Sequence, residues 1–236
     1  MSFSLETLGY AFLGGLLPSL IWLYFLLKED ARCPEPRRLV ALAFVAGMAA
    51  VPVVLPLEQW ISGAHLANTS VLIGWATIEE TMKYIAAALF ILWQRSVDES
   101  PDYVIYMLTV ALGFAAAENM LFLLAPLSTG HLVAGLVTDN LRFVGSTLLH
   151  VLASAAIGFS LAFSLRLGPA TRAFVAAGGL ILAIVLHTAF NALIIRSSGA
   201  TTLTAFFLIW SVAVIFFAVF EILKYIQYRN VPANVC

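Results

Sequence analysis

The stretch that decides the fold is residues 70–93, which read SVLIGWATIEETMKYIAAALFILW. It is apolar enough to cross a membrane, yet its centre carries Glu79, Glu80 and Lys83. Each ionised side chain near the middle of a spanning helix costs about 2.5–3.5 kcal/mol, so the three together cost about 8–10 kcal/mol. Such a helix must face the protein interior or a water-filled cavity. Lys83 lies one turn after both acids and offsets their charge.

The composition places the rest of the chain in the membrane as well. Of the 236 residues, 62% are hydrophobic and 11% are charged, which leaves too little polar surface to cover a soluble globule. Apolar runs of about 20 residues are long enough to span a bilayer. They predict a single all-α membrane domain over 1–236 with seven spans: 8–27, 38–57, 70–93, 103–125, 141–165, 172–195 and 203–223.

An eighth element is counted if the segment 126–140 re-enters the membrane. Pro126 and Gly130 make this segment irregular, while 132–137 is apolar enough to lie on the membrane. The sequence leaves open whether the segment is re-entrant.

The basic residues of the connecting segments are distributed unevenly. One side of the predicted bundle carries nine of them: Lys28, Arg32, Arg37, Arg38, Arg95, Arg166, Arg172, Lys224 and Arg229. The opposite side has only Arg142 and Arg196. Because the positive side is normally cytoplasmic, we expect the N-terminus outside and the C-terminus in the cytoplasm of a cell, with the protein in the plasma membrane. No basic stripe with interleaved aromatic residues points to nucleic acid.

Further polar residues lie inside three other predicted spans: Glu118 and Asn119 in 103–125, His150 in 141–165, and His187 and Asn191 in 172–195. With the predicted orientation, the adjacent acids, the third acid and both histidines all lie roughly 10–15 Å below the outer surface. Independent packing contacts have no reason to share a depth. The sequence therefore predicts one site built by four helices, although an asparagine alone is more typical of an interhelical hydrogen bond.

Three carboxylates and two histidines at one depth are typical of a site that activates water. A metal ion such as Zn²⁺ could be held by His150, His187 and Glu79, since two histidines and a glutamate form a known catalytic zinc set. Alternatively, a glutamate and a histidine could activate the water without metal, with Asn191 donating to the oxyanion. The sequence does not separate these mechanisms.

The two cations near the predicted site have simpler interpretations. We expect Lys83 to compensate charge and to position the acids rather than to act chemically. Arg142 lies at the outer end of its span, where arginine commonly anchors a helix at the interface. It could also reach a carboxylate such as Glu118.

Four motifs, in order and each in its own span, resemble those of the PrsW family of intramembrane proteases. They are Glu79-Glu80-x-x-Lys83, Phe114-x-x-x-Glu118-Asn119, His187-x-x-x-Asn191, and a set in which seven residues separate Arg142 from His150 and seven more separate His150 from Gly158. That family is distantly related to the CAAX prenyl endopeptidases and the CPBP (Abi) membrane proteins. The resemblance makes 70–195 the expected catalytic core.

The resemblance implies an intramembrane endopeptidase that cleaves a membrane-anchored protein near the extracytoplasmic face. In the best-known cases the partner is a single-span anti-sigma factor, cut at site 1 during regulated proteolysis. The resemblance also implies that Glu79 and Glu80 are the core catalytic acids, with His150 and His187 as partners for water or metal. Glu118 stands where the CAAX-type enzymes have histidine, so their mechanism does not transfer directly.

Two other functions compete with proteolysis. A proton-coupled transporter would use carboxylates and histidines as a relay, but the polar residues form one layer instead of a path, and we find no inverted repeat. A non-catalytic scaffold or immunity protein could share the fold. Loss of a motif residue would favour that function, yet the expected acids, histidines and Asn191 are all present.

Overall fold

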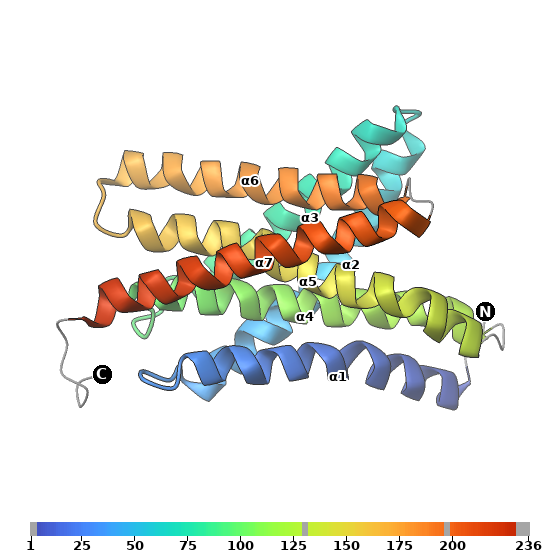
Figure 1. Cartoon of the computed structure of the whole chain (residues 1–236), viewed down its shortest axis with the longest axis horizontal. Coiled ribbons are helices and arrows are strands. Elements are labelled where there is room, and N and C mark those ends of the chain that lie inside the picture. The colour runs from blue at the N-terminus through green and yellow to red at the C-terminus, as the bar shows by residue number, and fades with distance from the viewer. Residues whose placement is uncertain (1–3, 129–131, 196–198, 230–236) are drawn as a thin grey trace.

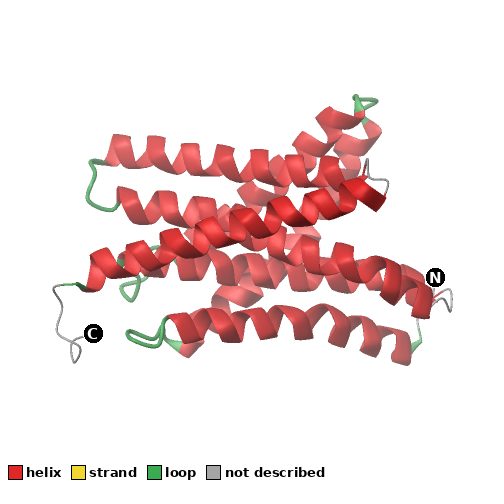
Figure 2. Cartoon of the chain, in the orientation of Figure 1, coloured by secondary structure: helices red, strands yellow, loops and turns green. Residues whose placement is uncertain are grey.

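The computed structural model describes residues 4–128, 132–195 and 199–229, with side chains left out at 125, 128, 132–144, 194, 195 and 199–202. The described part is helical and has no strand (Figure 2). The helices are α1 (Leu5–Glu29), α2 (Arg37–Gly63), α3 (Asn68–Phe90), α4 (Ser100–Ser128), α5 (Leu132–Ser164), α6 (Pro169–Ile195) and α7 (Gly199–Tyr228). The prediction of an all-α bundle is confirmed.

Six of these seven helices are long and apolar enough to cross a membrane. The exception is α3, whose 23 residues have the length of a span but include three charges. Those charges are shielded, because Glu79 is 4% exposed and both Glu80 and Lys83 are 0% exposed. Of the seven predicted spans, six are thus apolar helices, and the helix at 70–93 has its polar face inside the protein, as its charges led us to expect.

The segment 126–140 does not form a separate eighth element in the described residues. Residues 126–128 complete α4, and residues 132–140 are the beginning of α5, which continues without interruption to Ser164. Residues 129–131 lie outside the described part. A helix of 33 residues is about 50 Å long, so α5 exceeds the thickness of the hydrocarbon core.

The centre of the bundle is formed by α4 and α5, with α1 on one side and α6 on the other (Figure 1). In their most apolar stretches, 56% of α4 and 78% of α5 is buried, against 17% for α1 and for α7. Helix α3 crosses the bundle obliquely and packs against α2 and α6. The central pair can therefore present side chains to α3 away from lipid.

A pair of glycines lets α2 and α4 cross in close contact. A Cβ atom on Gly47 would lie 2.0 Å from the carbonyl oxygen of Val110, and one on Gly113 would lie 1.9 Å from that of Phe44. Such distances leave no room for any side chain, so the two backbones meet directly. The crossing fixes α4 against α2 next to the charged centre of the bundle.

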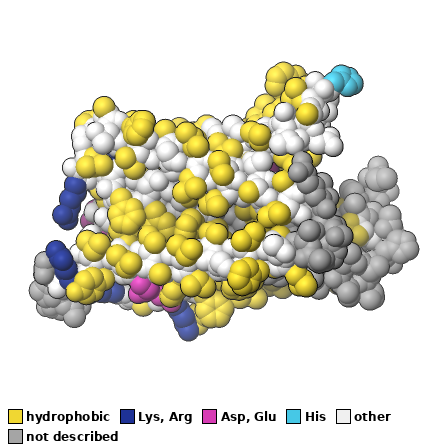
Figure 3. Space-filling model, turned by 45° about the horizontal axis from the view of Figure 1, so that its top comes forward, with side chains coloured by type: hydrophobic (Ala, Val, Ile, Leu, Met, Phe, Trp, Pro, Cys, Tyr) yellow, Lys and Arg dark blue, Asp and Glu magenta, His cyan; other side chains and the backbone are white. Residues whose placement is uncertain are grey.

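The surface is apolar around the bundle and basic toward one end. Figure 3 shows a face whose described side chains are mostly hydrophobic, with lysine and arginine gathered mainly toward one end. At this end, Lys224 of α7 forms ion pairs with Glu29 at 3.0 Å and Glu221 at 2.6 Å. Arg32 lies over the ring of Tyr228, 4.6 Å from its centroid. The contacts of Lys224 with Glu29 and of Arg32 with Tyr228 join the C-terminal ends of α1 and α7.

Replacing Gly113 by alanine should destabilise the bundle, because the added methyl group would force α2 and α4 apart. Overpacking of this kind typically costs about 1–3 kcal/mol. Gly178→Ala is the matched control, since a Cβ atom at Gly178 of α6 would have nothing within 4 Å. Thermal unfolding in detergent should show a lower midpoint for Gly113→Ala only. Equal midpoints for the two variants would contradict the close crossing.

Candidate metal centre

Helices α3, α4, α5 and α6 bring their intramembrane acids and histidines together in one buried cluster. The members are Glu79 and Glu80 from α3, Glu118 from α4, His150 from α5 and His187 from α6. The two histidines are 1% and 2% exposed. The residues that the sequence places at a common depth are thus neighbours in space.

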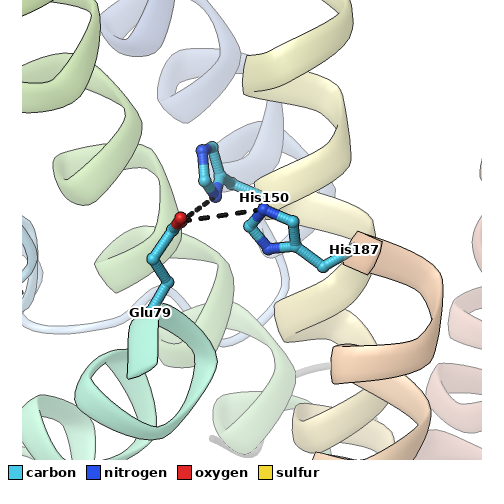
Figure 4. Close-up of side chains that lie close together, drawn as sticks. All are labelled: Glu79, His150 and His187. Atoms are coloured by element: carbon cyan, nitrogen blue, oxygen red, sulfur yellow. Dashed lines mark ion pairs between the residues drawn. The ribbon is translucent and has the colours of Figure 1, made fainter. Parts of the chain in front are cut away.

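Glu79 faces both imidazole rings (Figure 4). Its Oε2 atom lies 3.8 Å from His150 Nδ1 and 3.7 Å from His187 Nε2. The two rings meet edge to face, with their centroids 5.2 Å apart. This carboxylate oxygen is buried and lacks a hydrogen-bond partner in the described structure. An orphaned buried carboxylate oxygen beside two ring nitrogens indicates a place for a cation.

A carboxylate holds the far nitrogen of each histidine. His187 Nδ1 lies 2.7 Å from Glu80 Oε1, and His150 Nε2 lies 2.6 Å from Glu118 Oε2. Because an ionised carboxylate only accepts hydrogen bonds, we infer that these two nitrogens carry the ring hydrogens. The lone pairs then lie on His150 Nδ1 and His187 Nε2, the two atoms that face Glu79. A carboxylate behind a histidine is the usual support of a metal ligand.

Lys83 is fully buried inside the same cluster. Its Nζ atom lies 2.6 Å from Glu80 Oε1 and 2.9 Å from His150 Nδ1, and 4.9 Å from the centroid of the Phe114 ring. The contact with Glu80 is the charge compensation expected from the spacing of three residues. His150 Nδ1 has one lone pair, which either Lys83 or a metal ion can use. A metal ion at this atom therefore requires Lys83 to break its contact with His150, while its contact with Glu80 can remain.

The donor atoms fit a metal ion. In the described residues, Glu79, His150 and His187 form a group whose ligand atoms all lie within 4.8 Å of one another. A tetrahedral zinc site with bonds of about 2.0 Å has donors roughly 3.3 Å apart, close to the spacing around Glu79. Three acids of the cluster also face one lysine, so a divalent cation would balance the charge.

The remaining predicted residues are less closely tied to this centre. Asn119 donates from Nδ2 to Thr147 Oγ1 at 3.0 Å, which joins α4 to α5 as an interhelical hydrogen bond. Asn191 is partly buried one turn beyond His187, and no hydrogen bond connects its side chain with the acids or histidines of the described site. Arg142 belongs to α5, but its side chain lies outside the described part.

Two residues near the centre are not in the sequence-based prediction. Ser154 Oγ lies 3.5 Å from Glu80 Oε2, and its position one turn after His150 could have indicated this. The carboxyl group of Glu58 of α2 lies within hydrogen-bonding reach of that of Glu79. Glu58 stands just beyond the predicted span 38–57, where an acid is ordinarily solvated. No local pattern shows that α2 continues to Gly63 and lies against α3 there.

Comparison with known proteins identifies the family of the chain. The chain matches the family described as PrsW family intramembrane metalloprotease over residues 35–222, a longer stretch than the expected core 70–195. Protease PrsW of Geobacillus kaustophilus (strain HTA426) is 29% identical over 105 residues, which cover 43% of this chain and 46% of the relative. Protease PrsW of Bacillus subtilis (strain 168) is 24% identical over 113 residues, covering 47% and 52%.

The matched stretches span about half the length of these curated relatives. No solved structure matches the chain at a comparable level. The family match nevertheless covers most of the chain and includes every helix that supplies the buried acids and histidines. The chain is a multi-pass membrane protein that belongs to the PrsW family of intramembrane metalloproteases.

Proposed function

We propose that the protein is a zinc-dependent intramembrane endopeptidase. The observation that carries this proposal is the buried set of two histidines and one glutamate, in which an acid supports the far nitrogen of each histidine. Isolated structural histidines have no need of this arrangement. It is typical of imidazoles that are held in one tautomer to bind a metal ion.

In the proposed centre, His150, His187 and Glu79 would hold Zn²⁺, which would supply an activated water and polarise the scissile carbonyl. Glu80 and Glu118 keep the imidazoles in the required tautomer. The remaining polar groups have positioning roles: Lys83 balances Glu80, and Asn191 is placed on the same helix as His187 to donate to the oxyanion.

Burial of the donor atoms would favour this reaction. The donor atoms lie among four helices, where few water molecules compete and electrostatic interactions are stronger than in bulk water. The supporting carboxylates are already hydrogen-bonded to the imidazoles, so the ring orientations are set in advance. Little reorganisation is then needed when the substrate arrives.

The proposed substrate is a single-span membrane protein, such as an anti-sigma factor, cut near the extracytoplasmic side. The orientation proposed from the nine basic residues places the α2–α3 connection outside. Helices α4 and α6 begin at the basic end, and Glu118 and His187 lie beyond their midpoints. The site then lies in the outer half of the membrane, within reach of a bond close to that surface.

Zinc binding is the first expected outcome. The purified protein should bind one zinc ion per chain. His187→Ala should abolish binding because it removes a donor atom, and Glu79→Gln should do so because it replaces the charged carboxylate donor by a neutral amide. Glu118→Gln should weaken binding about 10–100-fold through its support of His150. Competition with a chromophoric chelator measures these affinities, and Glu221→Gln, at the far end of α7, is the matched control. Equal zinc content in wild type and His187→Ala would contradict the assigned donor set.

Cleavage is the second expected outcome. Wild-type protein in liposomes should cut a single-span anti-sigma factor, whereas Glu79→Gln and His187→Ala should be slower by at least about 100-fold. Gel electrophoresis of the substrate follows the reaction, and a chelator should stop it.

The pattern of results separates the alternatives. Chelator-resistant cleavage that still requires Glu79 would favour the metal-free glutamate mechanism. Folded variants that cleave as fast as wild type would overturn the site. If wild type cuts none of a panel of single-span substrates, a scaffold or a transporter explains the protein better.

A further inference from the structure

We propose that Glu58 is an additional residue of this site, which positions the carboxylate of Glu79 from the outer end of α2. The role deepens the proposed function and rests on it. Glu58 belongs to none of the four motifs that relate the sequence to the family.

The first observation is the direct contact between the two acids. The carboxyl group of Glu58 lies within hydrogen-bonding reach of that of Glu79. A contact of this kind restrains the direction of both side chains. Glu79 keeps its Oε2 atom free of hydrogen bonds and directed at the two imidazoles. Glu58 thereby restrains the side chain that must present this oxygen to the metal.

The second observation is that the backbone of α2 is pinned to α3 at this level. Trp75 Nε1 donates to the carbonyl oxygen of Glu58 at 3.3 Å, and Trp75 lies one turn before Glu79. One residue earlier, a Cβ atom on Gly74 would lie 2.8 Å from Ile61 Cδ1. The two helices are therefore closely packed around Glu58, and its position opposite Glu79 is set by the fold.

The third observation is that the other acids of the cluster have different partners. Glu80 is bound to Lys83 and His187, and Glu118 is bound to His150. Neither has a described hydrogen bond to Glu79. Glu58 is also only partly buried, whereas Glu79 is 4% exposed. It therefore connects the buried donor with the outer end of the bundle.

The test compares variants of Glu58 with Gln59→Ala, the exposed neighbour on the same turn. Glu58→Ala removes the contact and should lower zinc affinity about 10–100-fold, the usual effect of losing a group that supports a metal ligand. Its kcat for a single-span substrate should fall while KM stays within about twofold of wild type. Glu58→Gln retains a donor for Glu79 and should recover most of the zinc affinity. Zinc competition and thermal unfolding are measured on the same preparations.

The outcomes are distinguishable from those of the proposed function. If Glu58→Ala binds zinc and cleaves like Gln59→Ala while Glu79→Gln does neither, the positioning role is wrong and the protease proposal stands. If wild type neither binds zinc nor cleaves, the positioning role of Glu58 and the protease proposal are both wrong. Should the alanine variant not fold, Glu58→Met keeps a side chain of similar length without its hydrogen bond. A folded Glu58→Met with wild-type zinc affinity would equally overturn the role.

Discussion

Helix α3 can remain inside an apolar bundle only if its charges are kept away from lipid and matched by partners. Lys83 and Glu80 meet at 2.6 Å, and both are completely buried. A buried pair regains its desolvation cost only when further hydrogen bonds satisfy the remaining polar atoms. Here His150 contacts the lysine and His187 contacts the acid. The two imidazoles at the centre therefore also provide hydrogen-bond partners for the buried ion pair.

The packing of the other helices follows from this requirement. The charged face of α3 contacts His150 of α5 and His187 of α6, whereas α1 and α7 are among the least buried of the apolar helices. Close approach is obtained with glycine, as at the contact of Gly47 and Gly113 with the opposite backbones. With α2 held so near α4, its outer end also reaches α3, where Trp75 joins the two helices. A tight bundle thus encloses a polar centre.

The side chains that stabilise the buried charges are also those of the candidate metal site. Glu80 is bound to Nδ1 of His187, and Glu118 is bound to Nε2 of His150. The other nitrogen of each ring, with its lone pair, faces Glu79. In the metal-free arrangement Lys83 takes one of these lone pairs. The lysine and a metal ion compete for that nitrogen, and the excess of carboxylates over lysine favours the divalent cation. In the proposed function, the structural network and the metal site are two states of the same side chains.

The sequence by itself determined the helical class and the membrane location, and it predicted Glu79, His150 and His187 as members of one site, because apolar length, charge and depth are properties of each segment alone. Only the tertiary structure decided the partners. Pairing of Glu80 with His187 and Glu118 with His150, and the approach of Glu58, depend on how each helix is rotated and where it crosses its neighbours. Depth along one helix contains no information about rotation, so these contacts could not be predicted from the chain.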